Sequence, residues 1–527
     1  MKLRDQYDWI VLGDHPAALL SGAMAARLGL SVLALPVGEG VPLASAADGA
    51  FLDRETNYLL GLHPLTAEGG GNGLLGQCIA RLGLLKSEED QFLSEGWSPQ
   101  VLSPDLRFQI QPDPGATFVE LRRELGADGE RLLREQGIQA AWTRASTRLP
   151  QFWSQWPDRL TLETPTDPKG GKGLRAKAVP LTLREFLSRL GRELKGEGRD
   201  AQRWFDVGST LEHRKEEPSG AALYEALCGI WAGLSAKDRS SRVMRAELLH
   251  LACLAGSGGA YRGGMSRFRE FIRRQGRKYG VHFPERGEAI RIFGEGNRFV
   301  GVQSSYRGQM IAAGAGILGV SPERLPESFL ERSEKRLARY RKQVRVTGWR
   351  FSIAVFVDEK AIPPGMSHRM VWQEADSPAL ELEWADPADY GIRRPGQAVI
   401  FLRTELDYAQ ATLNREFQRL TAARMLRKLV EIVPFSEYRI ARIYPDFRDG
   451  TESTEMFEVY PYDELAKIPD GLLVYEGEGL GCVSGLDGLY VASEESYPGM
   501  GSVGPVVAAM EAVALLAHQA GLPGPLA

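Results

Sequence analysis

Hydrophobic and polar positions near the start of the chain follow two different periods. Residues 9–12 form a short apolar run, residues 16–28 carry small and apolar side chains at helical spacing, and residues 31–35 form a second apolar run after Gly29. A strand, a helix and a strand in this order predict a βαβ unit, because parallel strands need a crossover helix. The loop before residue 16 then lies at the carboxyl end of the first strand.

Further elements are predicted downstream from the same periodicities. They are a helix that opens at Gly263 and Gly264, a hairpin over 289–304, strands of a separate sheet at 349–358 and 397–403, a strand at 488–492 and a terminal helix at 504–519. Residues 160–180 are rich in Pro, Gly and Lys with little hydrophobic period, which predicts a surface loop.

Composition narrows the class of protein. A chain of 527 residues with 43% hydrophobic residues predicts two or more folded domains. The net charge of −4 gives no overall attraction to nucleic acid, so we expect no nucleic-acid partner. The four cysteines form no CxxC pair, and the seven histidines show no metal-ligand spacing, so neither a disulfide framework nor a metal site is predicted.

The N-terminal residues, the apolar runs and two basic stretches bear on where the protein is located in the cell. The first residues lack the long apolar region and cleavage site of a signal peptide, and no run of about 18 apolar residues occurs, so we expect a cytoplasmic protein. Residues 262–278 and 332–350 are strongly basic. Solvated faces or internal ion pairs are the default interpretation of both, and peripheral contact with anionic lipid headgroups is the alternative.

The loop after the first strand departs from a dinucleotide-binding fingerprint. In the GxGxxG/A spacing the three positions fall on Gly13, His15 and Ala18, so the first is kept, the second is lost and the third is acceptable. Asp14 is predicted to cap the helix that begins at Pro16. His15 is either a phosphate contact or a loop residue bonded to backbone, and Pro36 stands where an acid would hold a ribose.

The stretch from Gly485 to Ala517 carries a more specific pattern. A strand and an acid, followed by YPGMGSVG and a helix of small residues, resemble the C-terminal flavin-binding signature of the FAD-dependent phytoene desaturase, carotenoid isomerase and amine oxidase superfamily. Residues 97–125, 261–276 and 296–325 resemble further segments of that superfamily in the same order, and residues 48–56 are a weaker match.

The resemblance implies FAD as cofactor and assigns further residues to its site. These are Gly38, Gly264, Met265, Glu494, Gly499, Met500 and Gly501. Ser493 replaces a glycine of the signature, and Glu494 replaces its aspartate. Two plainer interpretations stay open, in which Glu494 is a solvated acid at a strand end and Gly264 serves only the turn before a helix. No catalytic side chain is predicted, because a flavin carries the chemistry itself.

The expected architecture is α/β. We expect a discontinuous Rossmann-like FAD-binding domain formed by residues 1–96, 258–325 and 475–527, and an inserted α+β substrate domain formed by residues 97–257 and 326–474. The resemblance implies hydride transfer or isomerisation on a hydrophobic polyene or isoprenoid substrate. The alternative is a non-catalytic relative that has lost tight flavin binding at His15, Pro36 and Ser493 and serves as a subunit for a protein partner. NAD(P) in place of FAD is a third, weaker interpretation.

Overall fold

The computed structural model describes part of the chain. The described residues are 4–37, 58–59, 62, 73–93, 97–135, 139–140, 143, 146–149, 151–153, 258–321, 325, 329, 345–374, 378–385, 395–407, 415–444, 472–476, 481–498 and 500–525. The predicted loop at 160–180 therefore lies outside them.

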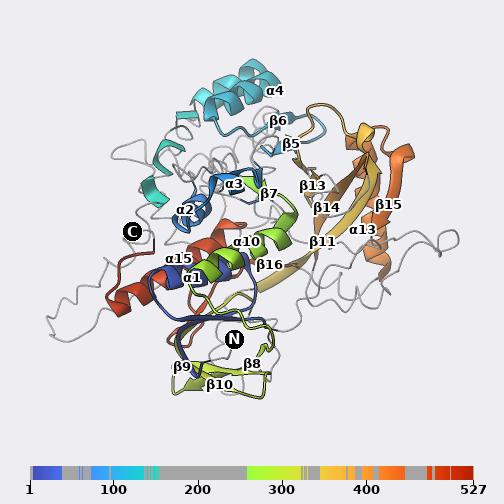
Figure 1. Cartoon of the computed structure of the whole chain (residues 1–527). Helices are drawn as coiled ribbons and strands as arrows, with labels where there is room; N and C mark the ends of the chain where they lie inside the picture. Colours follow the sequence, from blue (N-terminus) through green and yellow to red (C-terminus); the bar gives the residue numbers. More distant parts are fainter. Residues whose placement is uncertain are drawn as a thin grey trace.

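A six-stranded sheet forms the first half of the fold (Figure 1). Its strand order is β2-β1-β10-β9-β8, and β17 pairs with β10. The pairs β1–β2, β1–β10 and β10–β17 are parallel, whereas β8 and β9 are antiparallel to their neighbours. The strands are β1 (Gln6–Leu12), β2 (Val32–Leu35), β8 (Ala289–Glu295), β9 (Arg298–Ser304), β10 (Met310–Leu318) and β17 (Leu489–Val491). The predicted βαβ unit and hairpin are confirmed.

Three helices cover one face of this sheet. They are α1 (Pro16–Arg27), α10 (Gly264–Lys278) and α15 (Val503–Ala520), which lie side by side in Figure 1. Alternate strand residues divide the core, because successive side chains of a strand point to opposite faces. Trp9 and Val11 join the cluster with the helices, whereas Ile10 and Leu12 join a second cluster with β8 and β9.

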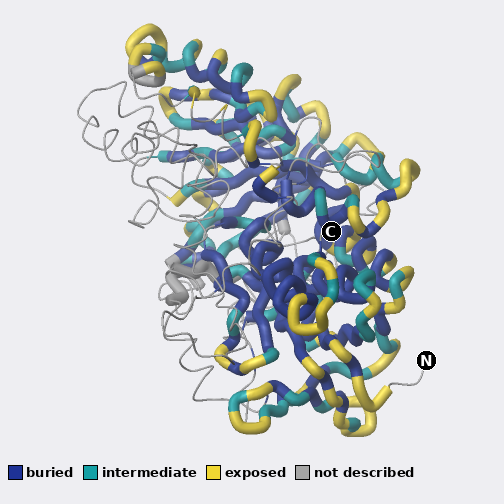
Figure 2. The backbone as a smooth tube through the Cα atoms, turned by 90° about the vertical axis from the view of Figure 1, so that its left-hand side faces the viewer, coloured by how far each residue is buried: buried dark blue, intermediate teal, exposed yellow. Residues whose placement is uncertain are grey.

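Helix α15 is the most apolar of the three. It is long and apolar enough to cross a membrane by length and composition, yet 83% of it is buried inside the protein. Every residue from Val503 to Ala517 is buried, and Figure 2 shows the middle of the molecule in the dark blue of buried residues. We therefore interpret α15 as a core helix.

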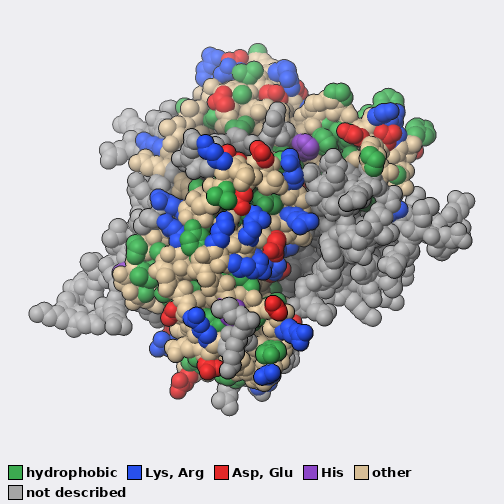
Figure 3. Space-filling view, viewed as in Figure 1, with side chains coloured by type: hydrophobic (Ala, Val, Ile, Leu, Met, Phe, Trp, Pro, Cys, Tyr) green, Lys and Arg blue, Asp and Glu red, His purple; other side chains and the backbone are tan. Residues whose placement is uncertain are grey.

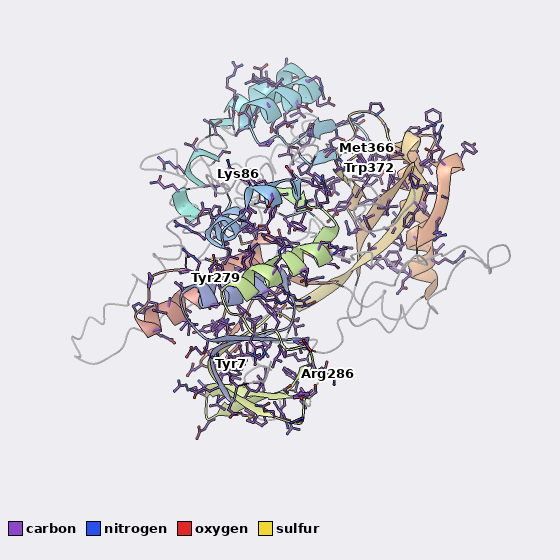
Figure 4. The ribbon with its side chains drawn as sticks, viewed as in Figure 1. Tyr7, Lys86, Tyr279, Arg286, Met366 and Trp372 are labelled. Atoms are coloured by element: carbon purple, nitrogen blue, oxygen red, sulfur yellow. The ribbon has the colours of Figure 1, made fainter. Side chains whose placement is uncertain are left out.

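An eight-stranded sheet forms the second half. Its order is β15-β11-β14-β13-β12-β5-β6, and β16 pairs with β11. The strands are β5 (Gln100–Leu102), β6 (Arg107–Gln109), β11 (Arg345–Asp358), β12 (Arg369–Trp372), β13 (Leu380–Ala385), β14 (Gln397–Asp407), β15 (Ile440–Tyr444) and β16 (Leu472–Glu476). One face packs on α13 (Arg415–Ile432) through Ile353, Ile400 and Leu429. Met366 and Trp372, labelled in Figure 4, belong to the same apolar cluster.

Smaller elements complete the described part of the chain. A three-stranded sheet joins β3 (Tyr58–Leu59), β7 (Gly259–Tyr261) and β4 (Phe92–Leu93), and the helices α2 (Leu74–Arg81), α3 (Lys86–Glu89) and α4 (Pro114–Glu135) lie in the upper part of Figure 1. The α/β class predicted from the sequence is confirmed. The residue boundaries of the two predicted domains stay a prediction.

Candidate functional site

The register of the parallel strands brings four distant segments to one edge of the first sheet. Leu12 of β1 pairs with Leu35 of β2 and with Leu318 of β10, and Leu318 pairs in turn with Val491 of β17. The residues that follow these four leave the sheet at its carboxyl edge. Ligands of open parallel sheets bind outside this edge, so we call it the candidate cofactor edge.

Two glycines, Gly13 after β1 and Gly319 after β10, let the two backbone segments pack closely at this edge. We call this close approach the glycine crossing. Gly13 has a positive φ of 97°, and a Cβ there would lie 3.0 Å from the carbonyl oxygen of Gly319. A Cβ on Gly319 would lie 2.6 Å from the Cβ of Ala18 and 3.2 Å from that of His15. The amide of Gly319 donates to the carbonyl of Leu12 at 2.6 Å. Small residues at 13, 18 and 319 are therefore required by packing.

His15, and not Asp14, caps helix α1. The Nδ1 atom of His15 accepts a hydrogen bond from the amide of Ala17 at 3.2 Å. The prediction that Asp14 is the cap is wrong, because Pro16 occupies the first helical position and the cap residue directly precedes that position. The imidazole thus uses one of the amides that an anion at a helix N-terminus would take.

Asp14 instead faces helix α10. Its carboxylate lies 3.9 Å from the Nη2 atom of Arg273, and both side chains are partly exposed. Two further arginines of α10 are paired, Arg274 with Glu88 at 2.9 Å and Arg277 with Glu270 at 3.2 Å. Figure 3 shows basic side chains gathered over the middle of this face. Ion pairing thus accounts for three bases of the stretch 262–278.

The segment after β17 supplies a buried polar turn. Ser493 is 5% exposed, and its Oγ atom is buried without a hydrogen-bond partner among the residues that the structure describes. The amide of Ser493 is 3.4 Å from Ser496 Oγ, which itself donates to the carbonyl of Val491. Glu494 is half-buried, and Gly501 has a positive φ of 52° before helix α15 begins. We call residues 493–502 the C-terminal turn.

A buried hydrogen bond attaches this turn to helix α15. The hydroxyl of Tyr497 donates to the Oε1 atom of Glu511 at 2.6 Å, and each residue is 1% exposed. The same Glu511 carboxylate also affects Cys482. Burial is the main cause that raises the pKa of the Cys482 thiol well above its ordinary value, and the nearby Glu511 carboxylate is the second. Cys482 is therefore a protonated thiol, and it does not supply a nucleophile at neutral pH.

A ladder of buried and half-buried charges lies on the face of the second sheet opposite α13. The side chains alternate in sign across the strands, because Arg350 pairs in register with Glu405, Arg403 with Glu381, and Arg369 with Glu383. We call these six residues the charged ladder. Arg403 Nη1 lies 2.7 Å from Glu383 Oε2, and Arg350 Nη2 lies 3.2 Å from Glu381 Oε1. Arg369 also pairs with Glu383.

Arg350 of the charged ladder is also influenced by an acid of the C-terminal turn. Its side chain is 11% exposed. Burial by itself would lower the pKa of Arg350, but the carboxylates of Glu381 and Glu494 raise it above its ordinary value. Glu494, predicted as a flavin contact, is thus close enough to the Arg350 guanidinium to stabilise its charge.

The remaining predicted site residues fall into three groups. Gly264, with a φ of 78°, opens α10, and Met265 belongs to the helix-side core. Arg273 follows Gly264 by nine positions along the helix, a rise of about 14 Å along its axis. Met500 is 2% exposed and lies in the same core. Gly38 and Gly499 lie outside the described residues.

Sequence reasoning missed Gly319, Arg273 and the charged ladder. A glycine directly after a buried strand was the available signal for Gly319. The LELEWA pattern of β13 was the signal for the ladder, but alternating apolar and charged residues usually indicate a solvent-exposed face. No sequence feature indicates that α10 brings Arg273 to Asp14.

Solved structures resemble the whole chain in fold. An oxidoreductase from Methanosarcina mazei aligns over 95% of this chain and 99% of its own, with 14% identity and a TM-score of 0.54. The PF1083 protein from Pyrococcus furiosus aligns over 97% of each chain, with 14% identity and a TM-score of 0.52. A putrescine oxidase variant covers 98% of this chain and 99% of its own at 14% identity, but its TM-score of 0.47 is too low to support an argument.

Comparisons at the level of sequence give no match. No protein-family model matches the chain, and no curated protein matches it. The structural likeness covers nearly the full length of both compared chains, so it concerns the overall architecture and not one shared segment. The chain has the fold of the Methanosarcina mazei oxidoreductase.

Proposed function

We propose that the protein is an FAD-dependent oxidoreductase whose dinucleotide lies along the candidate cofactor edge. The observation that carries the proposal is the row of Leu12, Leu318 and Val491, which places the glycine crossing and the C-terminal turn side by side. A bound flavin would supply hydride transfer to or from a substrate carbon. The protein's own residues would supply the position and charge around it.

Two features of the edge fit a dinucleotide. Gly13 packs closely against Gly319, as the first glycine of a dinucleotide-binding loop does in the tight turn. The buried Ser493 Oγ, which has no partner among the described residues, is suited to a hydrogen bond with a polar ligand group. A buried hydroxyl without a partner costs stability, so a ligand there would remove a penalty as well as add a contact.

Other features of the edge weaken the phosphate site. Pro16 has no amide, the Ala17 amide is taken by His15, and Asp14 adds a negative charge that Arg273 partly balances. At the end of β2 the side chain of Pro36 offers no acceptor, and its carbonyl accepts from the amide of Ala289. We therefore expect FAD affinity to be lower than a complete GxGxxG loop would give.

Glu494 and Arg350 have a role of their own in this proposal. The Glu494 carboxylate favours the charged form of the Arg350 guanidinium, so charge complementarity acts between the C-terminal turn and the second sheet. The charged ladder then forms a rigid, nearly neutral surface on this side of the sheet. A polyene or isoprenoid substrate, as the sequence resemblance implies, stays a prediction.

The test is a titration of FAD into folded, flavin-free protein by calorimetry. We expect saturation at one FAD per chain, and we expect Gly13→Ala to weaken binding because its Cβ meets the Gly319 carbonyl. Gly29→Ala is a matched control, because Gly29 has a similar φ of 91° but nothing within 4 Å of a new Cβ. Equal FAD affinity of the two variants would contradict the proposed position of the cofactor.

A second candidate is a protein that keeps this fold without bound flavin and serves as a binding subunit. The capping of the Ala17 amide by His15 is the observation that favours it. The two candidates differ in one result of the titration. Folded protein that takes up no FAD at high concentration would support the binding subunit and contradict the oxidoreductase.

A further inference from the structure

We propose that His15 is a proton-controlled cap at the candidate cofactor edge, which releases the phosphate-binding amide of Ala17 when the imidazole is protonated. The inference rests on the proposed FAD site and concerns its regulation. It predicts that FAD binds more tightly as the pH falls from 8.0 to 5.5.

The first step follows from the direction of one hydrogen bond. The Ala17 amide donates to Nδ1 of His15 at 3.2 Å. An imidazole nitrogen accepts a hydrogen bond only through its lone pair, and both ring nitrogens become donors once the ring is protonated. Protonation therefore breaks this bond, because two donors would then face each other.

The second step concerns what the released amide can bind. Pro16 lacks an amide, so Ala17 carries the first amide hydrogen of helix α1. Amides in this position point out of the helix end and attract anions. With neutral His15 the side chain satisfies the amide, whereas with protonated His15 a dinucleotide phosphate can satisfy it and also meet the positive charge of the ring.

The third step concerns the other charges beside the imidazole. They include Asp14, in the same loop, and Arg273, which approaches Asp14 from α10 at 3.9 Å. Carboxylates and guanidinium groups ordinarily keep their charges between pH 5.5 and 8.0, the range in which histidine changes its own. His15 is therefore the group at this loop whose ordinary titration range falls between pH 5.5 and 8.0.

Packing keeps His15 where this change matters. A Cβ on Gly319 would lie 3.2 Å from the His15 Cβ and 3.4 Å from its amide nitrogen, so the histidine backbone lies directly against the end of β10. The ring can leave the cap by turning about its side-chain bonds, while its Cβ stays beside the glycine crossing. A protonated ring consequently remains near the edge at which the dinucleotide is proposed to bind.

The experiment measures FAD affinity at pH 5.5, 6.5 and 8.0 by calorimetry, with circular dichroism to confirm that the protein is folded at each pH. For the natural protein we expect FAD to bind about tenfold more tightly at pH 5.5 than at pH 8.0. His15→Asn should bind with little pH dependence, because the asparagine side-chain oxygen caps the helix at every pH. His15→Gly should bind more tightly than His15→Asn at pH 8.0, because no side chain takes the amide.

A control variant tests whether the loss of an exposed histidine away from the loop has the same effect. His518 is exposed in the last turn of α15, so His518→Asn should keep the full pH dependence. Equal pH dependence in the natural protein and in His15→Asn would overturn the inference while leaving FAD binding intact. An absence of FAD binding in every variant at every pH would overturn the proposed function and the inference together.

Discussion

The hydroxyl of Tyr497 donates a 2.6 Å hydrogen bond to the carboxylate of Glu511, eight residues into helix α15. Tyr497 lies in the C-terminal turn, and both side chains are 1% exposed. The bond folds the turn back onto the helix that follows it. The backbone that would meet the flavin is thus held by a contact in the core, several residues away from the ligand.

Tyr497→Phe should therefore loosen the turn. The change removes a donor from a buried acceptor, so we expect the free energy of unfolding to fall by about 1–3 kcal/mol, measured by urea denaturation. FAD affinity should fall as well in the protein that remains folded. Tyr438 is 88% exposed, so Tyr438→Phe is the control and should leave both quantities unchanged. A variant as stable as the natural protein would show that the bond contributes nothing to the fold.

Removal of one cation from the charged ladder should be costly. Arg403 is fully buried and lies 2.7 Å from the Glu383 carboxylate. Arg403→Met leaves that carboxylate buried with one partner fewer, so we expect a loss of about 3–5 kcal/mol in the free energy of unfolding. Arg134 makes a similar 2.8 Å pair with Glu130 on the surface. Arg134→Met should cost less than about 1 kcal/mol, and equal losses in the two variants would contradict the importance of burial.

Stability should fall in mild acid because of His282. Its Nδ1 atom is 2.6 Å from the hydroxyl of Tyr7, which Figure 4 labels, and burial together with positive charges that include Arg4 lowers the pKa of His282 from its ordinary 6.5. As the pH drops below about 6.5, the unfolded chain takes up a proton that the folded chain resists. The free energy of unfolding should therefore decrease from pH 7 to pH 5. His282→Gln should flatten this decrease, and an unchanged pH profile would contradict the assignment.

Gly319→Ala tests the close crossing at the cofactor edge. The new methyl group would lie 2.6 Å from the Cβ of Ala18, so the start of α1 must shift away from β10. We expect a loss of about 1–3 kcal/mol in stability and weaker FAD binding, measured on the same preparation. Gly294→Ala is the control, because its nearest neighbours are at ordinary contact distances of 3.4 and 3.8 Å. Gly319→Ala with natural stability and affinity would show that the crossing tolerates a side chain.

Local patterns in the sequence predicted much of the fold. Residues 9–35 specify a strand, a helix and a strand through their own periodicity, and the hairpin over 289–304 is equally local. The pairing of β10 between β1 and β17 is a tertiary feature, because it joins residues 12, 318 and 491. The sequence therefore predicted the elements of the cofactor edge but not the register that assembles them.

The candidate site was predicted less completely than the fold. The Gly13 loop and the C-terminal turn were identified from short motifs, yet the cap was assigned to Asp14 although Pro16 fixes it at His15. The charged ladder was missed, since Glu381 looks like a surface residue until Arg403 of another strand lies beside it. Burial of a charge depends on its partners, and those partners are distant in the sequence.

The amount of FAD bound by the purified, untagged protein tests the central claim most directly. The measurement is an absorption spectrum followed by denaturation and analysis of the released chromophore, with added FAD for any flavin-free fraction. The account predicts a flavin spectrum and release that approaches one FAD per chain once the protein is saturated. A folded, colourless protein that releases no flavin and binds none of the added FAD at pH 5.5 or at pH 8.0 would contradict it.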